Sequence, residues 1–246
     1  MRIAVVGNTK QTLKGLSRLI EEKYNVVYVH GLSSEKTKSK VNSVCLKEFC
    51  NTHNIVLDKS NDWNNLLNLE VDLIICLGDS RIVPPEVLSK QNVIGNHGAI
   101  LPFVQGGASY VWGRMLNTGK WGVSIMELGE IVDSGKILAT KEFLYEPDCN
   151  MEDFCDAADN ATVELLFEYL DGKHTPTENS KWNVKIARHT DTKFVTDILR
   201  CTLEEGKNIY LPPRRPIDSI LKDDWGEKFT KLFKIANNKP YPRWYK

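Results

Sequence analysis

The chain has 246 residues, 41% of them hydrophobic, and its 32 Lys and Arg residues balance 32 Asp and Glu residues. This composition excludes a disordered chain and provides for a sizeable buried core. A net charge of zero gives no overall attraction to nucleic acid or to an anionic membrane, so neither is expected as a partner.

Targeting signals are not expected. The segment 1–10 has a single basic residue before a short apolar run and no small-residue cleavage site, unlike a signal peptide. The longest apolar runs, such as 72–78, are far too short to span a bilayer. The six cysteines contain no CxxC pair and are expected to be free thiols. The sequence therefore predicts a cytoplasmic protein.

The first hundred residues alternate short apolar runs with helical periodicity, such as Leu13, Leu16 and Leu19 at three-residue steps. Strands are expected at 3–7, 26–30, 55–57, 73–77 and 93–94, with helices at 13–23, 44–49, 63–69 and 84–88 between them. This alternation is typical of a doubly wound parallel sheet, in which ligands bind beyond the carboxyl ends of the strands. We therefore expect the site at 78–83 and 95–102.

The pattern changes after residue 106. Helices are expected at 107–117, 151–170, 192–204 and 225–236, and strands at 123–128 and 137–145. Asn150 is the expected N-cap of the long helix, and a polar linker covers 171–179. The sequence thus predicts an α/β fold with a Rossmann-like, mostly parallel sheet and helices on both faces. The expected domains are a catalytic domain at 1–180 and a small carboxyl-terminal region at 181–246.

Three short motifs are ambiguous when each is taken alone. Gly7 follows the first strand, but a dinucleotide fingerprint needs GxGxxG there, so we expect an ordinary strand-to-helix turn. His97 follows a buried strand between Gly95 and Gly98, which allow close backbone approach, although a lone histidine is more often structural. Asp133 lies in a turn between two strands, where an acidic residue commonly bonds its own backbone.

The order and spacing of these motifs change that interpretation. His97 and Asp133 lie 36 residues apart, and the chain also contains Ile100-Leu101-Pro102, Gly106, Gly122-Val123-Ser124 and Asp133-Ser134-Gly135. This arrangement resembles the formyltransferase family of methionyl-tRNA formyltransferase, glycinamide ribonucleotide formyltransferase and the sugar N-formyltransferases. The resemblance covers about 1–145 in layout. Downstream, Arg214-Arg215-Pro216-Ile217-Asp218, Trp225 and Pro240-Tyr241-Pro242 are similar to the tail of the sugar N-formyltransferases.

The resemblance implies transfer of a formyl group from 10-formyltetrahydrofolate to the primary amine of a nucleotide-linked amino sugar, as in lipopolysaccharide and O-antigen biosynthesis. The implied catalytic residues are Asn96, His97 and Asp133. The implied folate contacts are Arg81, Ile82, Val83, Glu130, Val132 and Asp133. The implied acceptor contacts are Phe103, Gln105, Gly106, Tyr110, Arg214 and Arg215. Such acyl transfer needs oxyanion donors and an acid toward the leaving nitrogen. It needs no metal, and the five histidines have no metal-ligand spacing.

One position departs from the family pattern. The family asparagine lies two residues before the histidine, where this chain has Gly95, and its asparagine is Asn96. Adjacent side chains of an extended segment point in opposite directions, so Asn96 does not simply take over the role. We expect a local backbone shift, permitted by the flanking glycines, to bring its amide into the site. The alternative is that another donor supplies the hydrogen bond.

Three other functions stay open. A methionyl-tRNA formyltransferase usually has a longer, basic carboxyl-terminal domain, and a glycinamide ribonucleotide formyltransferase lacks the Arg-Arg-Pro tail. A non-catalytic folate- or nucleotide-binding protein is the alternative from another class. Arg214 and Arg215 also fit an exposed surface pair, and Phe103, Tyr110 and Trp112 also fit core positions. The resemblance allows a homodimer through the carboxyl-terminal region.

Overall fold

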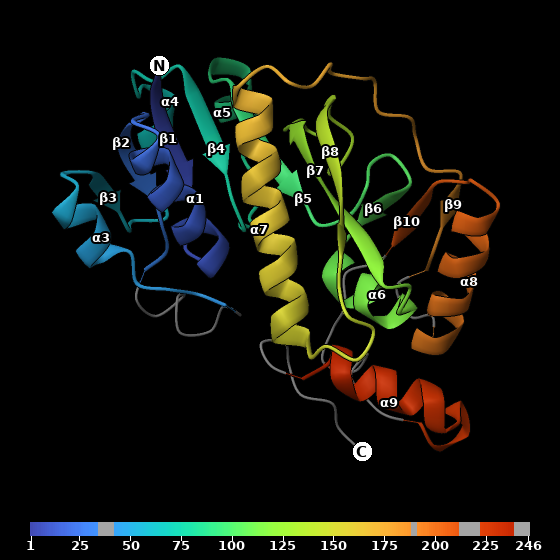
Figure 1. Cartoon of the computed structure of the whole chain (residues 1–246). Helices are drawn as coiled ribbons and strands as arrows, with labels where there is room; N and C mark the ends of the chain where they lie inside the picture. Colours follow the sequence, from blue (N-terminus) through green and yellow to red (C-terminus); the bar gives the residue numbers. More distant parts are fainter. Residues whose placement is uncertain (34–41, 188–190, 212–221, 239–246) are drawn as a thin grey trace. The chain divides into compact units, whose positions relative to one another are not determined.

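The computed structural model describes residues 1–33, 42–187, 191–211 and 222–238 (Figure 1). The chain divides into two compact units. Unit 1 comprises Met1–Asn96 and Ile125–Lys136, and unit 2 comprises His97–Ser124 and Ile137–Lys246.

Unit 1 is built on parallel strands. They are β1 (Arg2–Val6), β2 (Asn25–His30), β3 (Val56–Asp58), β4 (Leu73–Cys76) and β5 (Val93–His97), in the order β3-β2-β1-β4-β5. The helices are α1 (Lys10–Glu21), α3 (Lys47–Thr52), α4 (Asn64–Leu67) and α5 (Pro85–Lys90). Helix α1 covers one face of these strands, and α4 and α5 lie on the other (Figure 1). The carboxyl ends of the strands therefore meet at one edge.

Both faces of this parallel sheet are apolar, because its β-branched runs are buried on each side. One face forms a cluster with α4 and α5 that contains Ala4, Val6, Leu66, Ile74, Cys76, Val83, Val87 and Val93. Ile3 and Val5 alternate onto the other face, toward α1, where Leu16 and Leu19 are fully buried. Each such side chain contributes about 1.5–3 kcal/mol of burial free energy.

Helix α1 begins at a capping box, in which the side chains of Thr9 and Thr12 each accept a hydrogen bond from the other residue's backbone N–H. Thr12 Oγ1 also donates to the Leu77 carbonyl at 2.7 Å. A Cβ on Gly7 would lie 2.3 Å from that same carbonyl. The single glycine of this turn therefore allows close packing between the first turn of α1 and the end of β4.

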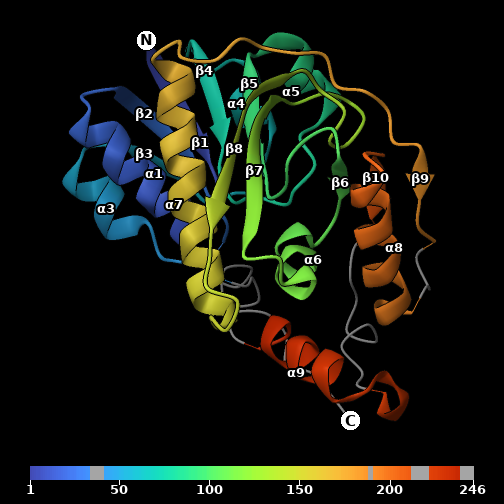
Figure 2. The ribbon, with the colours of Figure 1, turned by 45° about the vertical axis from the view of Figure 1, so that its right-hand side comes forward.

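Within its described residues, unit 2 contains a small sheet, four α-helices and part of a hairpin, whose residues Ile125–Lys136 belong to unit 1. The hairpin joins β7 (Lys120–Glu127) to β8 (Ile137–Leu144), and the small sheet has the order β6 (Val104–Gly106), β10 (Ile209–Leu211), β9 (Val184–Lys185), all parallel. The helices are α6 (Ser109–Leu116), α7 (Met151–Leu170), α8 (Thr192–Glu204) and α9 (Glu227–Ala236), with a 3-10 turn η2 (Asp223–Trp225) before α9. Helix α7 packs along β8 (Figure 2).

The larger sheet has the order β3-β2-β1-β4-β5-β7-β8. The end of β7 meets the start of β5, since Leu128 N–H bonds to Val93 O, and the end of β8 meets the start of β7, since Tyr145 N–H bonds to Gly119 O. Strands β7 and β8 thus run antiparallel to their neighbours. The α/β, mostly parallel fold expected from the sequence is confirmed.

Most expected elements occur, with shifted ends. Helices α7 and α8 have the expected bounds, and β5 extends through His97, three residues further than expected. The three strands of the small sheet were not expected, because two or three residues are too few to show alternation. Since β10 pairs with β6, residues 209–211 share a sheet with residues 104–106 inside unit 2. The domain boundary at residue 180 stays a prediction.

Within the described ranges, no helix is long and apolar enough to cross a membrane. All six cysteines are free thiols. The described residues also include no group of three or more His, Cys, Asp or Glu side chains arranged to hold a metal ion.

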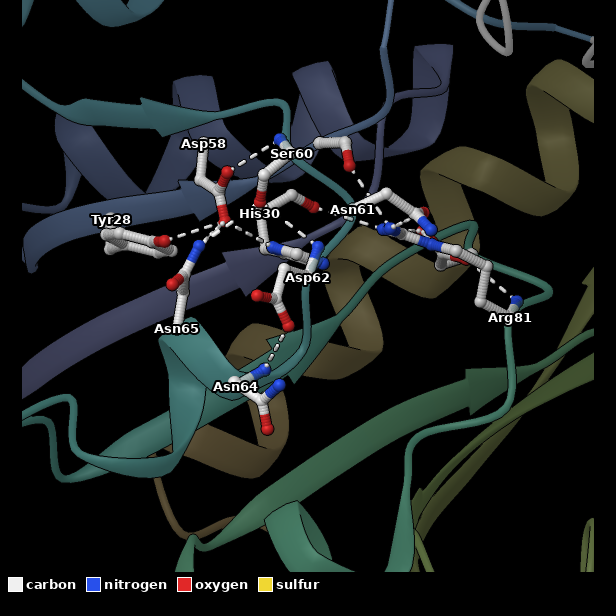
Figure 3. A network of polar contacts seen from close by, with 11 residues as sticks. Tyr28, His30, Asp58, Ser60, Asn61, Asp62, Asn64, Asn65 and Arg81 are labelled. Carbon is white, nitrogen blue, oxygen red and sulfur yellow. Dashed lines mark hydrogen bonds and ion pairs between the residues drawn. The ribbon is translucent and has the colours of Figure 1, made fainter.

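A carboxylate at the end of β3 ties several segments of unit 1 together (Figure 3). Asp58 accepts hydrogen bonds from Tyr28 Oη (2.8 Å), His30 Nδ1 (2.9 Å), the Ser60 N–H (2.7 Å) and Asn65 Nδ2 (3.1 Å). Burial by itself would raise the pKa of Asp58, but these hydrogen bonds outweigh burial and hold it well below its usual value. Burial and the hydrogen bond to Asp58 raise the pKa of Tyr28.

His30 is fully buried, and burial lowers its pKa despite the hydrogen bond to Asp58, which acts in the opposite direction. Its Nε2 has no hydrogen-bond partner among the described residues. Protonation would therefore bury a second N–H without an acceptor. Both depressed pKa values make acid destabilising: His30 below its unfolded pKa of about 6.5, and Asp58 below its unfolded pKa of about 4.

We predict that Asp58→Asn lowers the free energy of unfolding at pH 7 by about 2–4 kcal/mol, because it removes a charged acceptor of several hydrogen bonds. The variant should also lose less stability than the wild type as the pH falls below about 4, since the titrating carboxylate is gone. Urea unfolding at several pH values, followed by circular dichroism, measures both effects.

The matched control is Asp148→Asn, since the Asp148 side chain is 96% exposed. It should unfold like the wild type at pH 7. Equal stability of Asp58→Asn and the control at pH 7 would contradict a structural role for the Asp58 hydrogen bonds.

Candidate active site

His97 is the last residue of β5 and is only 6% exposed. Its Nε2 lies 2.9 Å from the carbonyl oxygen of Val104. Because a carbonyl only accepts, Nε2 carries the hydrogen in this contact. The orientation of the imidazole is therefore set by the start of β6.

The segment after His97 is fixed by two residues of β7. Ser124 Oγ donates to Ala99 O at 2.7 Å and accepts from Leu101 N–H at 2.9 Å. Trp121 Nε1 donates to Gly98 O at 2.7 Å. A Cβ on Gly122 would lie 2.3 Å from the Ile100 side chain. Two of the motifs that suggested the family, Ile100-Leu101-Pro102 and Gly122-Val123-Ser124, thus pack directly against each other.

Asp133 lies in the turn between β7 and β8 and is 9% exposed, with a φ of 54° in the left-handed region. Ser134 donates to Ile131 O through both its N–H (3.3 Å) and its Oγ (2.8 Å). A Cβ on Gly135 would lie 1.9 Å from Glu127 O, so only glycine fits there. The Asp-Ser-Gly sequence is therefore what this turn requires locally, and it also holds a buried carboxylate.

His97 belongs to unit 2 and Asp133 to unit 1. The juxtaposition of these two side chains stays a prediction from the family resemblance.

Asn96 differs from expectation in its local geometry. Strand β5 continues as a regular strand through His97, so Asn96 and His97 project to opposite faces. Asn96 Oδ1 accepts a hydrogen bond from the Gly78 N–H at 3.0 Å. The expected backbone shift is thus not present in β5.

Gly95, the position of the family asparagine, has no room for a side chain in the present packing. A Cβ there would lie 2.8 Å from Leu128 Cδ2 and 3.1 Å from Cδ1. Leu128 in turn packs against the apolar cluster of unit 1. An asparagine at residue 95 would therefore have to move the partly buried Leu128 side chain.

The loop 77–84 contains three of the expected folate contacts. The Arg81 side chain is engaged with Asp79 and with the ends of neighbouring strands, and Val83 is buried in the apolar cluster. Ile82 is 72% exposed. Ile131 and Val132 in the β7–β8 turn are exposed too, and Glu130 beside them is also exposed. The folate contacts of these residues stay a prediction from the family resemblance.

The expected acceptor contacts differ in their surroundings. Phe103 is exposed, whereas Gln105 is buried and donates to Asn179 Oδ1 at 3.4 Å. Gly106 approaches β10 closely, since a Cβ there would lie 2.0 Å from Leu211 O. Tyr110 Oη lies 3.4 Å from Asp159 Oδ1, and its ring packs edge-on against Phe154. Arg214 and Arg215 lie outside the described residues.

Sequence reasoning did not identify the residues that bond to, or stack against, the Arg81 guanidinium. They include Asn61, whose Oδ1 accepts from Nη1 at 3.0 Å, and Trp63, whose ring centre lies 5.0 Å from the guanidinium carbon. The available signal was Asp79-Ser80-Arg81 directly after the most apolar strand. Its partners come from a loop distant in the sequence, so spacing gave no hint of them.

Comparisons with known proteins identify the family of this chain. The sequence pattern of the family described as formyl transferase matches residues 1–170. The chain is similar to a methionyl-tRNA formyltransferase from Bacillus mycoides (strain KBAB4), 28% identical over 254 residues that cover 94% of this chain and 80% of that protein. Matches to further methionyl-tRNA formyltransferases cover 64% and 60% of their lengths.

Two solved structures share the fold. A sugar N-formyltransferase from Shewanella sp. FDAARGOS_354 has a TM-score of 0.67 at 13% identity, covering 100% of this chain and 92% of that one. WlaRD, a sugar 3N-formyl transferase solved in the presence of dTDP and 5-N-formyl-THF, has a TM-score of 0.68 at 13% identity, covering 96% and 78%. Since the family pattern spans more than half of its length, the chain belongs to the formyl transferase family and is a folate-dependent formyltransferase.

Proposed function

We propose that this protein transfers the formyl group of 10-formyltetrahydrofolate to the primary amine of a nucleotide-linked amino sugar. The observation that carries the proposal is the fixed His97 at the end of β5, in a chain of this family, followed by a loop that Ser124 holds in place. The balance of 32 basic and 32 acidic residues favours a small acceptor over a polyanionic tRNA. The WlaRD structure, solved with a nucleotide and a formyl-folate, is a precedent for this pair of ligands.

The proposed reaction begins when the neutral amine attacks the formyl carbon and forms the new C–N bond. The tetrahedral oxyanion then collapses, the bond to folate N10 breaks, and N10 takes up a proton. We assign that proton and the oxyanion contact to His97 Nδ1, because Nε2 is engaged by Val104 O. We assign to Asp133 the stabilisation of protonated His97 and the acceptance of the amine proton. We assign Arg81, Ile82, Val83, Glu130 and Val132 to the folate.

On the acceptor side, we propose contacts from Phe103, Gln105, Gly106 and Tyr110, together with Arg214 and Arg215, whose guanidinium groups match phosphate oxygens. The buried Gln105 and the half-buried Tyr110 contribute to the shape of this region, and Phe103 is the exposed aromatic side chain among them.

A second candidate is formyl transfer to methionyl-tRNA. The observation in its favour is the 28% identity with a methionyl-tRNA formyltransferase over 94% of this chain. The two candidates use the same donor and the same chemistry and differ in the acceptor.

We expect the purified protein to add one formyl group to at least one nucleotide-linked amino sugar when it is incubated with 10-formyltetrahydrofolate. Mass spectrometry of the acceptor and the absorbance of released tetrahydrofolate measure the two products. The panel should include dTDP-, UDP- and GDP-linked amino sugars and initiator methionyl-tRNA. Formylation of the tRNA alone would replace the first candidate by the second.

We predict that His97→Ala and Asp133→Asn each lower kcat by about 10²–10⁴, the range for loss of a general acid–base group. His53→Ala and Asp148→Asn are matched controls, because both residues are exposed, and both should retain wild-type rates. Circular dichroism checks that the fold is intact. Wild-type turnover in either active-site variant would remove that residue from the mechanism.

A further inference from the structure

The loop 77–84 between β4 and α5 depends on side chains for its shape. The N–H of Gly78 bonds to Asn96 Oδ1 at 3.0 Å, and the N–H of Arg81 bonds to Asp79 Oδ1 at 2.8 Å. Gly78 has a φ of 62°, and a Cβ there would lie 2.2 Å from Thr9 Oγ1. The turn out of β4 is thus tight, and it can be disturbed by losing a single side-chain partner.

Asn96 anchors the first half of the loop. Strands β4 and β5 are parallel neighbours in which Cys76 pairs with Gly95. Asn96 follows Gly95, so its side chain lies level with the point where the chain leaves β4, and there it accepts the Gly78 N–H. Asn96 makes this contact through its acceptor oxygen, Oδ1. Among the described residues, no hydrogen bond involves Asn96 Nδ2.

Arg81 anchors the second half (Figure 3). Its Nε and Nη2 donate to the Asp79 carboxylate at 3.0 and 2.7 Å, and the Asp79 side chain is only 2% exposed. Nη1 donates to Gly31 O at 3.1 Å and Nη2 to His30 O at 3.2 Å. The guanidinium therefore joins the loop to the end of β2, where the His30 carbonyl also accepts the Gly7 N–H at 3.1 Å.

Between these two anchors the loop exposes one apolar side chain. Ile82 lies between the anchored Arg81 and the buried Val83, and it is 72% exposed. A backbone held at both ends by partly buried polar groups presents its peptide groups and one apolar side chain in a fixed arrangement. Such preorganisation raises affinity for a flat, hydrogen-bonding ligand.

We propose that Asn96 and Arg81 are positioning residues that hold loop 77–84 in the form that binds the folate. Asn96 acts on the loop through Oδ1 and does not donate to the oxyanion. The inference rests on the proposed function in one respect, namely that this loop contacts the folate.

The two possible roles of Asn96 use different atoms, so Asn96→Asp separates them. Aspartate keeps an oxygen acceptor for the Gly78 N–H but has no N–H₂ donor for an oxyanion. We predict that Asn96→Ala raises the KM for 10-formyltetrahydrofolate by about tenfold with kcat changed by less than about threefold, since one positioning hydrogen bond is lost. We predict that Asn96→Asp stays within about threefold of the wild type in both constants.

The opposite result overturns this role. If Asn96→Asp and Asn96→Ala both lower kcat by about a hundredfold or more, Asn96 is an oxyanion donor. The Kd of 5-formyltetrahydrofolate, from titration of intrinsic fluorescence, provides a readout that does not need turnover. Wild-type Kd in Asn96→Ala would also overturn the inference.

We predict that Arg81→Ala weakens binding of 5-formyltetrahydrofolate by about tenfold or more, and that added methylguanidinium restores part of the affinity, because the cation refills the site between Asp79 and the two carbonyls. Arg18→Ala is a control on α1, where the half-buried Arg18 side chain forms an ion pair with Glu22 at 3.8 Å. Its affinity should be that of the wild type and should not respond to methylguanidinium. Unchanged affinity in Arg81→Ala would overturn the role of Arg81.

The failure of this inference differs from a failure of the proposed function. If the wild type binds the folate but formylates no amino sugar, the acceptor assignment fails while the loop experiment still gives a result. If the wild type formylates an amino sugar and both anchor variants keep wild-type KM and Kd, the positioning role fails and the proposed function stands.

Discussion

The edge of a parallel sheet leaves peptide groups that no further strand pairs, and in this protein side chains bond to them. In unit 1, Thr12 bonds to Leu77 O, Asn96 to the Gly78 N–H, and Arg81 to Gly31 O. An unpaired buried peptide group costs about 1–3 kcal/mol, so each of these contacts has a strong physical reason. The functional loops of such folds begin at this edge, and their shapes therefore follow from which side chains are present.

The same constraint accounts for the motif residues of unit 2. Ser124 and Trp121 bond to the backbone of 98–101, and Val104 O bonds to the His97 ring. In Gly122-Val123-Ser124, the serine therefore bonds to the segment that follows the histidine, and the glycine lets that segment pack closely. A motif that suggests catalysis can consist largely of residues that fix backbone around one reacting side chain.

The displaced asparagine follows from packing on the neighbouring strand. Leu128 fills the space in front of Gly95 and belongs to the apolar contacts of unit 1, so a larger residue at 95 would compete with core packing. Moving the amide one residue along the strand turns it to the opposite face, where the Gly78 N–H needs an acceptor. An amide at residue 95 would lie on the same face of β5 as His97, whereas at residue 96 it bonds to the loop that follows β4.

A polar network centred on Asp58, whose pKa is lowered, is connected to this edge of the sheet. Asp58 bonds Tyr28 and His30 from β2 and Asn65 from α4, and the ring of Trp63 contacts both His30 and Arg81. The network thereby links the ends of β2 and β3 to the loop after β4. The pKa values of Asp58 and His30 are both lowered in the folded state, so acid is expected to destabilise this network through both groups.

The sequence by itself determined the α/β class, the parallel strands of the first hundred residues, the long helix α7 and the family, because periodicity and ordered motifs are properties of local stretches of chain. Only the tertiary structure decided the small sheet of β6, β10 and β9, the partners of Arg81 and the contact of Asn96. Each of these depends on segments that are far apart in the sequence and meet only after folding, and a two- or three-residue strand has no period to read.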